Sequence, residues 1–525
     1  MYFLPELSAL PLISLAYAEL HYHLSWLYPL YYRRQPEIIA DLPHRLDLDK
    51  FDHLPLAIII KDAHLFPVTL HKVTAVITDS SGLSVTQNFD LELMLTEKWL
   101  SRIIPLSIAK FEPEQELQIK IEFSISNKKN SYKVINDNFP GISHKTFITW
   151  IAKKTLLLPS GWYAGDPHYH SNFTSDQVEF GADIKITKTI AKAMGLSWFF
   201  VTDHSYDLDD KEDDFTKNDP RLPKWHKMRK HCSELDEPDF RVIPGEEISI
   251  GNNKGQNVHL LSINYHEFIE GHGDSAEVWG KNKPQRNLDE IPKLKSKDNF
   301  FAAAHPFENV PFIQKLTLRR GNWSSKDFQQ SEINHLQLIN SDEPKVIEKA
   351  VKTWTNQLLK GKKYFILAAN DAHGNFNVMR QIKLPFISLW ETRKQIFGNW
   401  MTIFQSDVNN PITALKSGHN IVSNGPFLSF TLKKLDRSWQ FGDICPLRQA
   451  SVEYQANTTP QFGEIDTIYC YRGNINTGKE FRFPVACPVV IALPQHGYIR
   501  MSLITKKGFM AFTNPIFTQH GTRSS

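Results

Sequence analysis

Cysteine is scarce in this chain. The 525 residues include only Cys232, Cys445, Cys470 and Cys487, and no two of them form a CxxC pair. A zinc ribbon or a disulfide framework requires closely spaced cysteines, so neither is expected here. This usage favours a reduced, intracellular protein.

Long apolar runs are missing as well. No stretch approaches the ~20 apolar residues that a membrane-spanning helix needs. The apolar N-terminus is interrupted by Glu6 and Glu19 and lacks the basic start of a signal peptide. We therefore expect a cytoplasmic protein.

Two further absences narrow the function. The formal net charge is only +3, from 60 basic and 57 acidic residues, which gives no support for a nucleic-acid or membrane partner. A Gly-x-Ser-x-Gly nucleophile elbow is also absent from the sequence, which argues against a serine esterase. A small-molecule substrate remains open, and the sequence does not indicate an oligomeric state.

The apolar pattern changes twice along the chain. Residues 1–158 contain alternating strands such as Leu117–Phe123, which predicts an N-terminal β-sandwich-like domain. Residues 159–400 alternate short apolar runs with amphipathic helical patterns, which predicts a β/α barrel. Residues 401–525 return to a β-rich pattern. We therefore predict an α/β fold in which a barrel is flanked by two β-rich domains.

The most informative motif is Gly165-Asp166-Pro167-His168-Tyr169-His170-Ser171. Two histidines that are two residues apart on an extended segment point to the same side of the backbone. Both imidazoles can therefore reach one metal ion. We interpret this motif as the start of a metal site.

Seven further metal-competent residues lie mostly at the ends of apolar runs: Asp176, His204, Glu247, His259, His305, Asp371 and His373. Glu246 offers the same carboxylate as its neighbour, so the choice between Glu246 and Glu247 stays open. The C-terminal ends of parallel barrel strands converge on one face. Nine converging ligands exceed the three or four of a single zinc site. They predict two or three divalent ions, of Zn, Mn or Fe, with Glu247 as a bridging carboxylate.

Together these motifs resemble the PHP (polymerase and histidinol phosphatase) superfamily of metal-dependent hydrolases. The resemblance covers roughly residues 160–380 and rests on Asp-x-His-x-His, Thr-Asp-His, Gly-x-Glu, Ala-His-Pro and Asp-x-His. It implies a distorted seven-stranded β/α barrel with a two- or three-metal site, and it places the ligands at the nine positions above. The spacing of Gly-x-Glu selects Glu247.

The C-terminal part extends this resemblance. Segments 417–427, 498–500 and 513–516 are similar to the tail of stand-alone hydrolases of this type, which include carbaryl (carbamate ester) hydrolases. Such members join the barrel to β-rich flanking segments. The resemblance therefore implies an ester or phosphoester of low molecular weight as the substrate.

Two residues are candidates for a catalytic contribution beside the metals. Asp203 precedes a candidate ligand and is placed to orient its imidazole, although a loop or helix cap would explain it equally well. Arg380 lies seven residues beyond His373 and could bind a phosphate or carboxylate with two hydrogen bonds. The alternative for Arg380 is an ordinary surface arginine.

These observations predict a metal-dependent hydrolase, with a phosphoester as the leading substrate class and a metal-bridging hydroxide as the nucleophile. A carboxyl- or carbamate-ester hydrolase with the same metal site is the alternative enzyme. A metal-stabilised binding module is the alternative outside enzymes. An anionic-pocket arginine would favour a phosphoester, whereas an apolar aromatic pocket would favour an uncharged ester.

Overall fold

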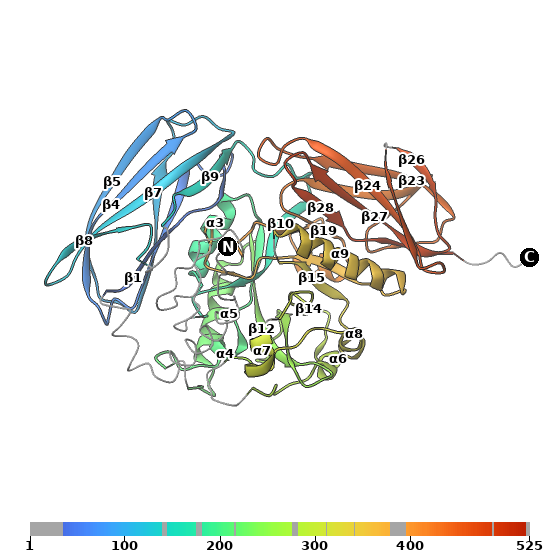
Figure 1. Cartoon of the computed structure of the whole chain (residues 1–525), viewed down its shortest axis with the longest axis horizontal. Coiled ribbons are helices and arrows are strands. Elements are labelled where there is room, and N and C mark those ends of the chain that lie inside the picture. The colour runs from blue at the N-terminus through green and yellow to red at the C-terminus, as the bar shows by residue number, and fades with distance from the viewer. Residues whose placement is uncertain are drawn as a thin grey trace, which may run out of the picture.

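Strand dominates the architecture of this protein (Figure 1). The computed structural model describes residues 35–138, 144–174, 181–214, 217–275, 282–310, 312–340, 342–378, 395–485 and 488–520. Strands make up 45% of the structure and helices 15%. The architecture is therefore a set of β-sheets with a minority of covering helices.

The N-terminal part forms two sheets that enclose a common core. One sheet has the order β1-β3-β6, and the other has the order β2-β9-β7-β4-β5 with β8 beside β7. In β7, Leu117, Ile119 and Ile121 are buried and the residues between them are exposed, as their alternation predicts. The bounds are β1 (Glu37–Asp41), β2 (Arg45–Asp47), β3 (His53–Lys61), β4 (Val68–Asp79), β5 (Ser84–Leu95), β6 (Trp99–Ser107), β7 (Gln115–Ser126), β8 (Ser131–Ile135) and β9 (Phe147–Ala152).

A 16-stranded sheet runs through the rest of the chain. Its order is β16-β15-β14-β13-β12-β11-β10-β18-β19-β28-β27-β24-β25, with β17 on β10 and β29 joining β27 to β22. Its first ten strands are β10 (Trp162–His170), β11 (Trp198–Val201), β12 (Arg241–Gly251), β13 (Asn257–Ile263), β14 (Phe300–Ala303), β15 (His335–Ile339), β16 (Phe365–Ala368), β17 (Ala372–His373), β18 (Met401–Gln405) and β19 (Asn420–Ser423).

The C-terminal strands complete this sheet and add a small one of order β21-β20-β23-β26. Their bounds are β20 (Phe427–Lys434), β21 (Arg437–Gln440), β22 (Ile444–Cys445), β23 (Gln449–Asn457), β24 (Ile465–Asn474), β25 (Lys479–Pro484), β26 (Val489–Ala492), β27 (His496–Thr505), β28 (Met510–Thr513) and β29 (Ile516–Gln519). Figure 1 shows these strands at the opposite end of the molecule from β1–β9.

Along the sequence, most of the described helices occur between strands β10 and β19. In α3, Asp183 caps the first turn by accepting hydrogen bonds from the amides of Lys185 and Ile186. Ile184 and Ile190 of this helix are buried against the core. The bounds are α3 (Ile184–Ala193), α4 (Ser205–Leu208), α5 (Pro223–Leu235), η1 (Leu288–Glu290), α6 (Ile291–Leu294), α7 (Phe312–Thr317), α8 (Ser325–Ser331), α9 (Pro344–Leu359) and α10 (Pro411–Lys416).

The predicted α/β fold, with a seven-stranded β/α barrel between two sandwich-like domains, is wrong. The central strands belong to a mixed sheet in which β12 pairs antiparallel with β13, β13 with β14, and β10 with β18. The connection between β12 and β13 is residues 252–256, which close a tight turn in which the Asn252 amide donates to the Gln256 carbonyl. A parallel crossover needs about a dozen residues or more, so this connection forces a hairpin.

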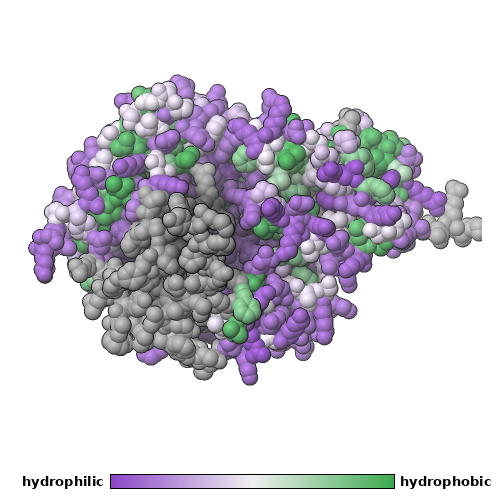
Figure 2. All heavy atoms as spheres, in the orientation of Figure 1, coloured by the Kyte–Doolittle hydropathy of each residue, from purple (hydrophilic) through white to green (hydrophobic). Residues whose placement is uncertain are grey.

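The division of the chain at residues 158 and 400 stays a prediction. The long sheet crosses residue 400, because β18 pairs with β10 on one side and with β19 on the other. In the part of the chain that the structure describes, no helix combines the length and apolarity needed to cross a membrane. Among the coloured residues of the face shown in Figure 2, hydrophilic side chains predominate and hydrophobic ones form small separate groups.

A buried histidine of the sheet makes stability depend on pH. His335 packs against Phe300 and Phe365, and its Nε2 donates to the Leu415 carbonyl at 2.9 Å. Burial lowers the pKa of His335 to about 3, whereas an unfolded histidine titrates near about 6.5. As the pH falls below about 6.5, His335 therefore binds a proton in the unfolded state but not in the folded state.

We expect His335 to cost up to about 1.4 kcal/mol of unfolding free energy per pH unit between about pH 6.5 and pH 3. The His335→Gln variant should lose this slope, while the exposed-histidine variant His226→Gln should keep it. Urea unfolding at several pH values measures the slope. An unchanged pH dependence in His335→Gln would contradict the assignment.

Candidate metal centre

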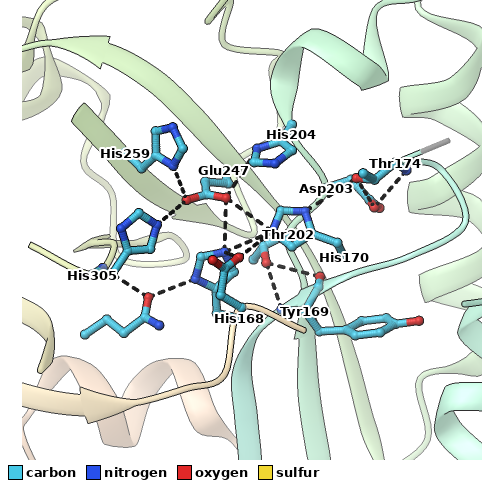
Figure 3. A network of polar contacts seen from close by, with 12 residues as sticks. His168, Tyr169, His170, Thr174, Thr202, Asp203, His204, Glu247, His259 and His305 are labelled. Carbon is cyan, nitrogen blue, oxygen red and sulfur yellow. Dashed lines mark hydrogen bonds and ion pairs between the residues drawn. The ribbon is translucent and has the colours of Figure 1, made fainter. Parts of the chain in front are cut away.

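The predicted ligands meet in one place (Figure 3). Eight of the nine lie in the described part of the chain, and all eight fall into three overlapping groups. Within each group the ligand atoms lie within 4.8 Å of one another. The groups are His170, His204 and His373; His168, His170, Glu247 and Asp371; and Glu247, His259 and His305. Asp176 lies outside the described residues.

Strand geometry explains this convergence. His168 and His170 alternate with Tyr169 on β10 and so share one face of the strand. The short strand β17 pairs parallel with β10 and sets His373 beside His170. His204 forms a parallel bridge with Glu247 just beyond the end of β11. Ligands that are far apart in the sequence are therefore neighbours through backbone pairing.

Glu247 occupies the middle of the cluster, and its two carboxylate oxygens face different histidines. Oε1 lies 2.6 Å from His259 Nδ1 and 3.0 Å from His305 Nε2. Oε2 lies 3.1 Å from His168 Nε2 and 3.2 Å from His170 Nε2. Burial alone would raise the pKa of Glu247, but His259, His168 and His204 hold it well below its usual range. The carboxylate is therefore anionic and divided between two sets of imidazoles.

Asp371 is the second carboxylate of the cluster. Its Oδ1 lies 3.1 Å from His170 Nε2 and 3.2 Å from His168 Nε2, and its Oδ2 accepts a hydrogen bond from Gln395 Nε2 at 3.0 Å. The backbone φ of Asp371 is 51°, in the left-handed region that aspartate tolerates better than most residues. This turn aims the carboxylate back at β10.

Three histidine rings form the remaining side of the cluster. The His170 ring lies parallel to His373 with 4.0 Å between ring centroids, and its centroid is 4.4 Å from that of His204, whose ring is tilted by 41°. Tyr206 stacks on His204 at 4.5 Å. One nitrogen of each of the three histidines lies within 4.8 Å of the others.

The donor atoms fit divalent cations. His168 Nδ1 must donate to Gln337 Oε1 at 2.8 Å, because an amide oxygen can only accept, and this leaves a lone pair on Nε2. That Nε2 lies 3.1 Å from His170 Nε2. Burial lowers the pKa of His170, but Asp371 and Glu247 raise it well above its usual value. The site therefore stabilises positive charge among its ligand atoms, and mixed imidazole and carboxylate donors suit Zn, Mn or Fe.

Further side chains orient the ligands from outside. His259 Nε2 lies 2.9 Å from Asp274 Oδ2, which leaves Nδ1 directed at Glu247. Gln337 accepts from His168 and also from the His305 amide at 3.3 Å. Such outer contacts fix the tautomer and plane of a ligand imidazole. No sequence pattern around Asp274, Gln337 or Gln395 would have identified them.

The structure shows which of Glu246 and Glu247 faces the histidines. Neighbouring residues on a strand point to opposite faces, so only one of them can face the histidines. Glu246 points away, where its Oε1 accepts from Trp225 Nε1 at 2.7 Å and its Oε2 from the Ile269 amide. Burial raises the pKa of Glu246 to about 7. Glu247 is therefore the residue whose position suits a ligand.

Asp203 lies beneath the cluster rather than in it. It is fully buried and accepts hydrogen bonds from the amide and hydroxyl of Ser171 at 2.7 Å each. It also accepts from the Thr174 amide and hydroxyl at 3.1 Å and 2.9 Å. Thr174 Oγ1 in turn lies 3.4 Å from His170 Nδ1. Asp203 thus holds the loop after β10, and its role in orienting a ligand imidazole stays a prediction.

Arg380 lies outside the described residues, but another arginine lies at the cluster. Arg320 Nε is 3.0 Å from Asp274 Oδ2, and one of its terminal nitrogens is 3.0 Å from His259 Nε2. Its side chain is 25% exposed. Burial would lower the pKa of Arg320, but Asp274 and Glu247 raise it, so the guanidinium stays charged. The sequence offered no motif for this residue.

Comparisons with known proteins add no assignment. No family model matches the chain, and no curated protein matches it. Among solved structures, β-glucuronidases from Parabacteroides merdae and Bacteroides uniformis and a β-D-mannosidase from Dictyoglomus thermophilum are similar at 9%, 8% and 9% identity.

These matches cover 94%, 92% and 92% of this chain and 65%, 61% and 66% of theirs, with TM-scores of 0.18, 0.17 and 0.19. The chain thus spans less than two thirds of the length of these proteins. TM-scores of this size establish neither a shared fold nor a shared activity.

Substituting Glu246 and Glu247 one at a time tests which of the two carboxylates binds metal. We expect Glu247→Gln to lose at least one equivalent of bound Zn²⁺ or Mn²⁺ per chain, because the carboxylate between the histidine groups is neutralised. Glu246→Gln should keep the metal, because its carboxyl group faces Trp225 instead. Metal analysis after dialysis measures both variants. Equal metal content in the two would contradict the geometry.

Proposed function

We propose that this protein is a metal-dependent hydrolase acting on a phosphoester. The observation that carries the proposal is the buried Glu247 carboxylate, whose two oxygens are shared between separate groups of histidines. A structural metal site usually closes with four ligands and leaves no open position. Eight ligands in three overlapping groups suit a polynuclear centre instead.

Each part of the centre has a role in this proposal. His168, His170, Glu247 and Asp371 would hold one ion, with His259 and His305 or His204 and His373 completing neighbouring positions. Bound divalent ions would supply a water of lowered pKa and would polarise the ester. Gln337 and Asp274 keep the lone pairs of His168 and His259 directed inward. The protein thus supplies preorganised ligands in a buried setting.

Charge balance supports an anionic substrate. Four carboxylates, from Glu247, Asp371, Asp274 and Glu308, and one guanidinium, from Arg320, lie at the described centre. Two divalent ions would outweigh the net negative charge of these described groups. Arginine binds phosphate oxygens with paired, charge-assisted hydrogen bonds. Arg320 therefore takes the part that the sequence suggested for Arg380.

A carboxyl- or carbamate-ester hydrolase would use the same ligands, and it remains the alternative enzyme. Its support is the similarity of the C-terminal segments to carbamate-ester hydrolases. The distinction lies in Arg320, which can pair its charge with a phosphate but can only donate hydrogen bonds to an uncharged ester. The binding-module alternative differs from both enzymes because it predicts bound metal but no hydrolysis.

A substrate panel tests these possibilities together. We expect Mn²⁺- or Zn²⁺-dependent hydrolysis of aryl phosphomonoesters or phosphodiesters to exceed that of aryl esters and aryl carbamates. His168→Ala should lower the rate at least about 100-fold, because even partners outside the ligand shell change activity by 10- to 100-fold. The exposed-site control His226→Ala should not, and circular dichroism checks folding.

Turnover that persists after chelation would overturn the metal-dependent mechanism. A preference for aryl carbamates would transfer the assignment to the alternative enzyme. Bound metal with no hydrolysis of any member of the panel would favour the binding module.

Arg320 gives a second, more selective test. Hydrogen bonds to charged groups contribute about 1.5–3 kcal/mol, so Arg320→Gln should lower kcat/KM for phosphoesters by about 10- to 100-fold. Aryl-ester turnover should change less, and Arg319→Gln serves as the matched control. Metal content is measured alongside, because Arg320 also contacts Asp274. Equal losses on charged and uncharged substrates would contradict phosphate binding by this residue.

A further inference from the structure

The chain that carries Asp371 and His373 runs directly into the N-terminal sheets. We call residues 369–378 the ligand loop. Phe376 is fully buried and packs in the central core, while Val378, two residues later, joins the core of the N-terminal sheets. The loop thus passes from the metal centre into another packing unit within a few residues.

Side chains of the N-terminal sheets hold the backbone of Phe376 on both sides. The Phe376 amide donates to Asp41 Oδ2 at 3.1 Å, and its carbonyl accepts from His44 Nδ1 at 3.0 Å. Asp41 is fully buried at the end of β1. Arg45 Nε donates to the other ring nitrogen of His44 at 3.1 Å, which leaves the ring proton on Nδ1. The hydrogen bonds to the Phe376 backbone therefore have defined donors and acceptors.

Asn377 makes the closest link to these sheets. Its Oδ1 accepts from the Ile148 amide at 3.1 Å, and its Nδ2 donates to the Ile148 carbonyl at 2.9 Å. Ile148 lies in β9 beyond the point where β2 pairs with that strand, at Arg45 and Trp150. The amide of Asn377 therefore takes the place of a neighbouring strand, and it is fully buried.

Residues 395–398 hold the other side of the ligand loop, and Arg45 of β2 holds these residues in turn. Gln395 donates to Asp371 Oδ2, and the Phe397 amide donates to the Asn375 carbonyl at 2.9 Å. Arg45 is fully buried and its guanidinium donates to the Gly398 carbonyl. One arginine of β2 thus restrains the segment that positions the Asp371 carboxylate.

The ligand loop also contains two residues with left-handed backbone conformations. Asp371 has a φ of 51° and Gly374 a φ of 65°. A Cβ atom at Gly374 would lie 2.7 Å from the Ala182 amide nitrogen, so the loop is pressed against the chain before α3. Left-handed residues persist only where surrounding contacts determine them. Those contacts include Asp41, His44 and Ile148.

We propose that the N-terminal sheets act as the positioning device for the Asp371–His373 half of the metal centre, with Asn377 as the principal positioning residue. This inference rests on the proposed metal centre. It assigns a role to β1, β2 and β9, none of which contributes a ligand to the groups described above. Asn377 acts through the backbone of the ligand loop and does not contact substrate.

Asn377→Ala in the full chain tests the proposal, with Asn299→Ala as the matched control. Asn299 is also buried and also makes one accepted and one donated bond to backbone, from the Ser296 amide at 2.8 Å and to the Leu294 carbonyl at 2.7 Å, but it lies outside the N-terminal sheets. Zn²⁺ affinity is measured by calorimetry. Amide hydrogen exchange of residues 369–378 is measured on the metal-free protein, so one readout needs neither metal nor turnover.

We expect Asn377→Ala to bind Zn²⁺ about 10- to 100-fold more weakly and to exchange faster throughout the ligand loop, while Asn299→Ala matches the wild type in both. Asn377→Gln, which keeps both hydrogen-bonding groups on a side chain one methylene longer, should be intermediate and serves if the alanine variant does not fold. Wild-type affinity and exchange in the Asn377 variants would overturn the inference. A wild-type chain that binds none of Zn²⁺, Mn²⁺ and Fe²⁺ would overturn the proposed function instead, while the exchange result would still decide whether Asn377 holds the loop.

Discussion

The division of one carboxylate between two sets of imidazoles is the constraint around which the centre is arranged. Glu247 can face both sets only because it lies in the middle of β12, with β13 on one side and the bridge to His204 on the other. His259 comes from that neighbouring strand, and His305 follows the next one, β14. The β12–β13 hairpin therefore determines where the Glu247 carboxylate lies, and every other candidate ligand must lie close to it.

Burying so much charge is costly unless each group has a partner. An uncompensated ion in a protein interior costs several kcal/mol, and the centre contains two buried carboxylates of its own. Asp274, Arg320, Gln337 and Gln395 satisfy the outward atoms of these groups. The inward atoms are left facing one another, and this is the arrangement that the proposed cations would relieve.

The sequence indicated which side chains meet better than it indicated the fold. Strand alternation places His168 and His170 on one face, and apolar runs that end in His204 or His305 indicate where strands stop. Topology was not predictable in the same way, because the five residues between β12 and β13 decide between a hairpin and a crossover. Arg320 and Asp274 escaped notice because they lie in irregular segments and meet only through the fold. Asp203 was identified, but its partners Ser171 and Thr174 make it a support for the loop.

The pairing of β10 has a consequence for the order in which the molecule can assemble. This strand carries two ligands and is bordered on one side by β11 and on the other by β18 and β17. Its second border is thus made from residues that come more than 200 positions later. Contacts of such long range form late and slowly. During synthesis, a strand with an unpaired edge would have to wait for them, exposed to association with other chains.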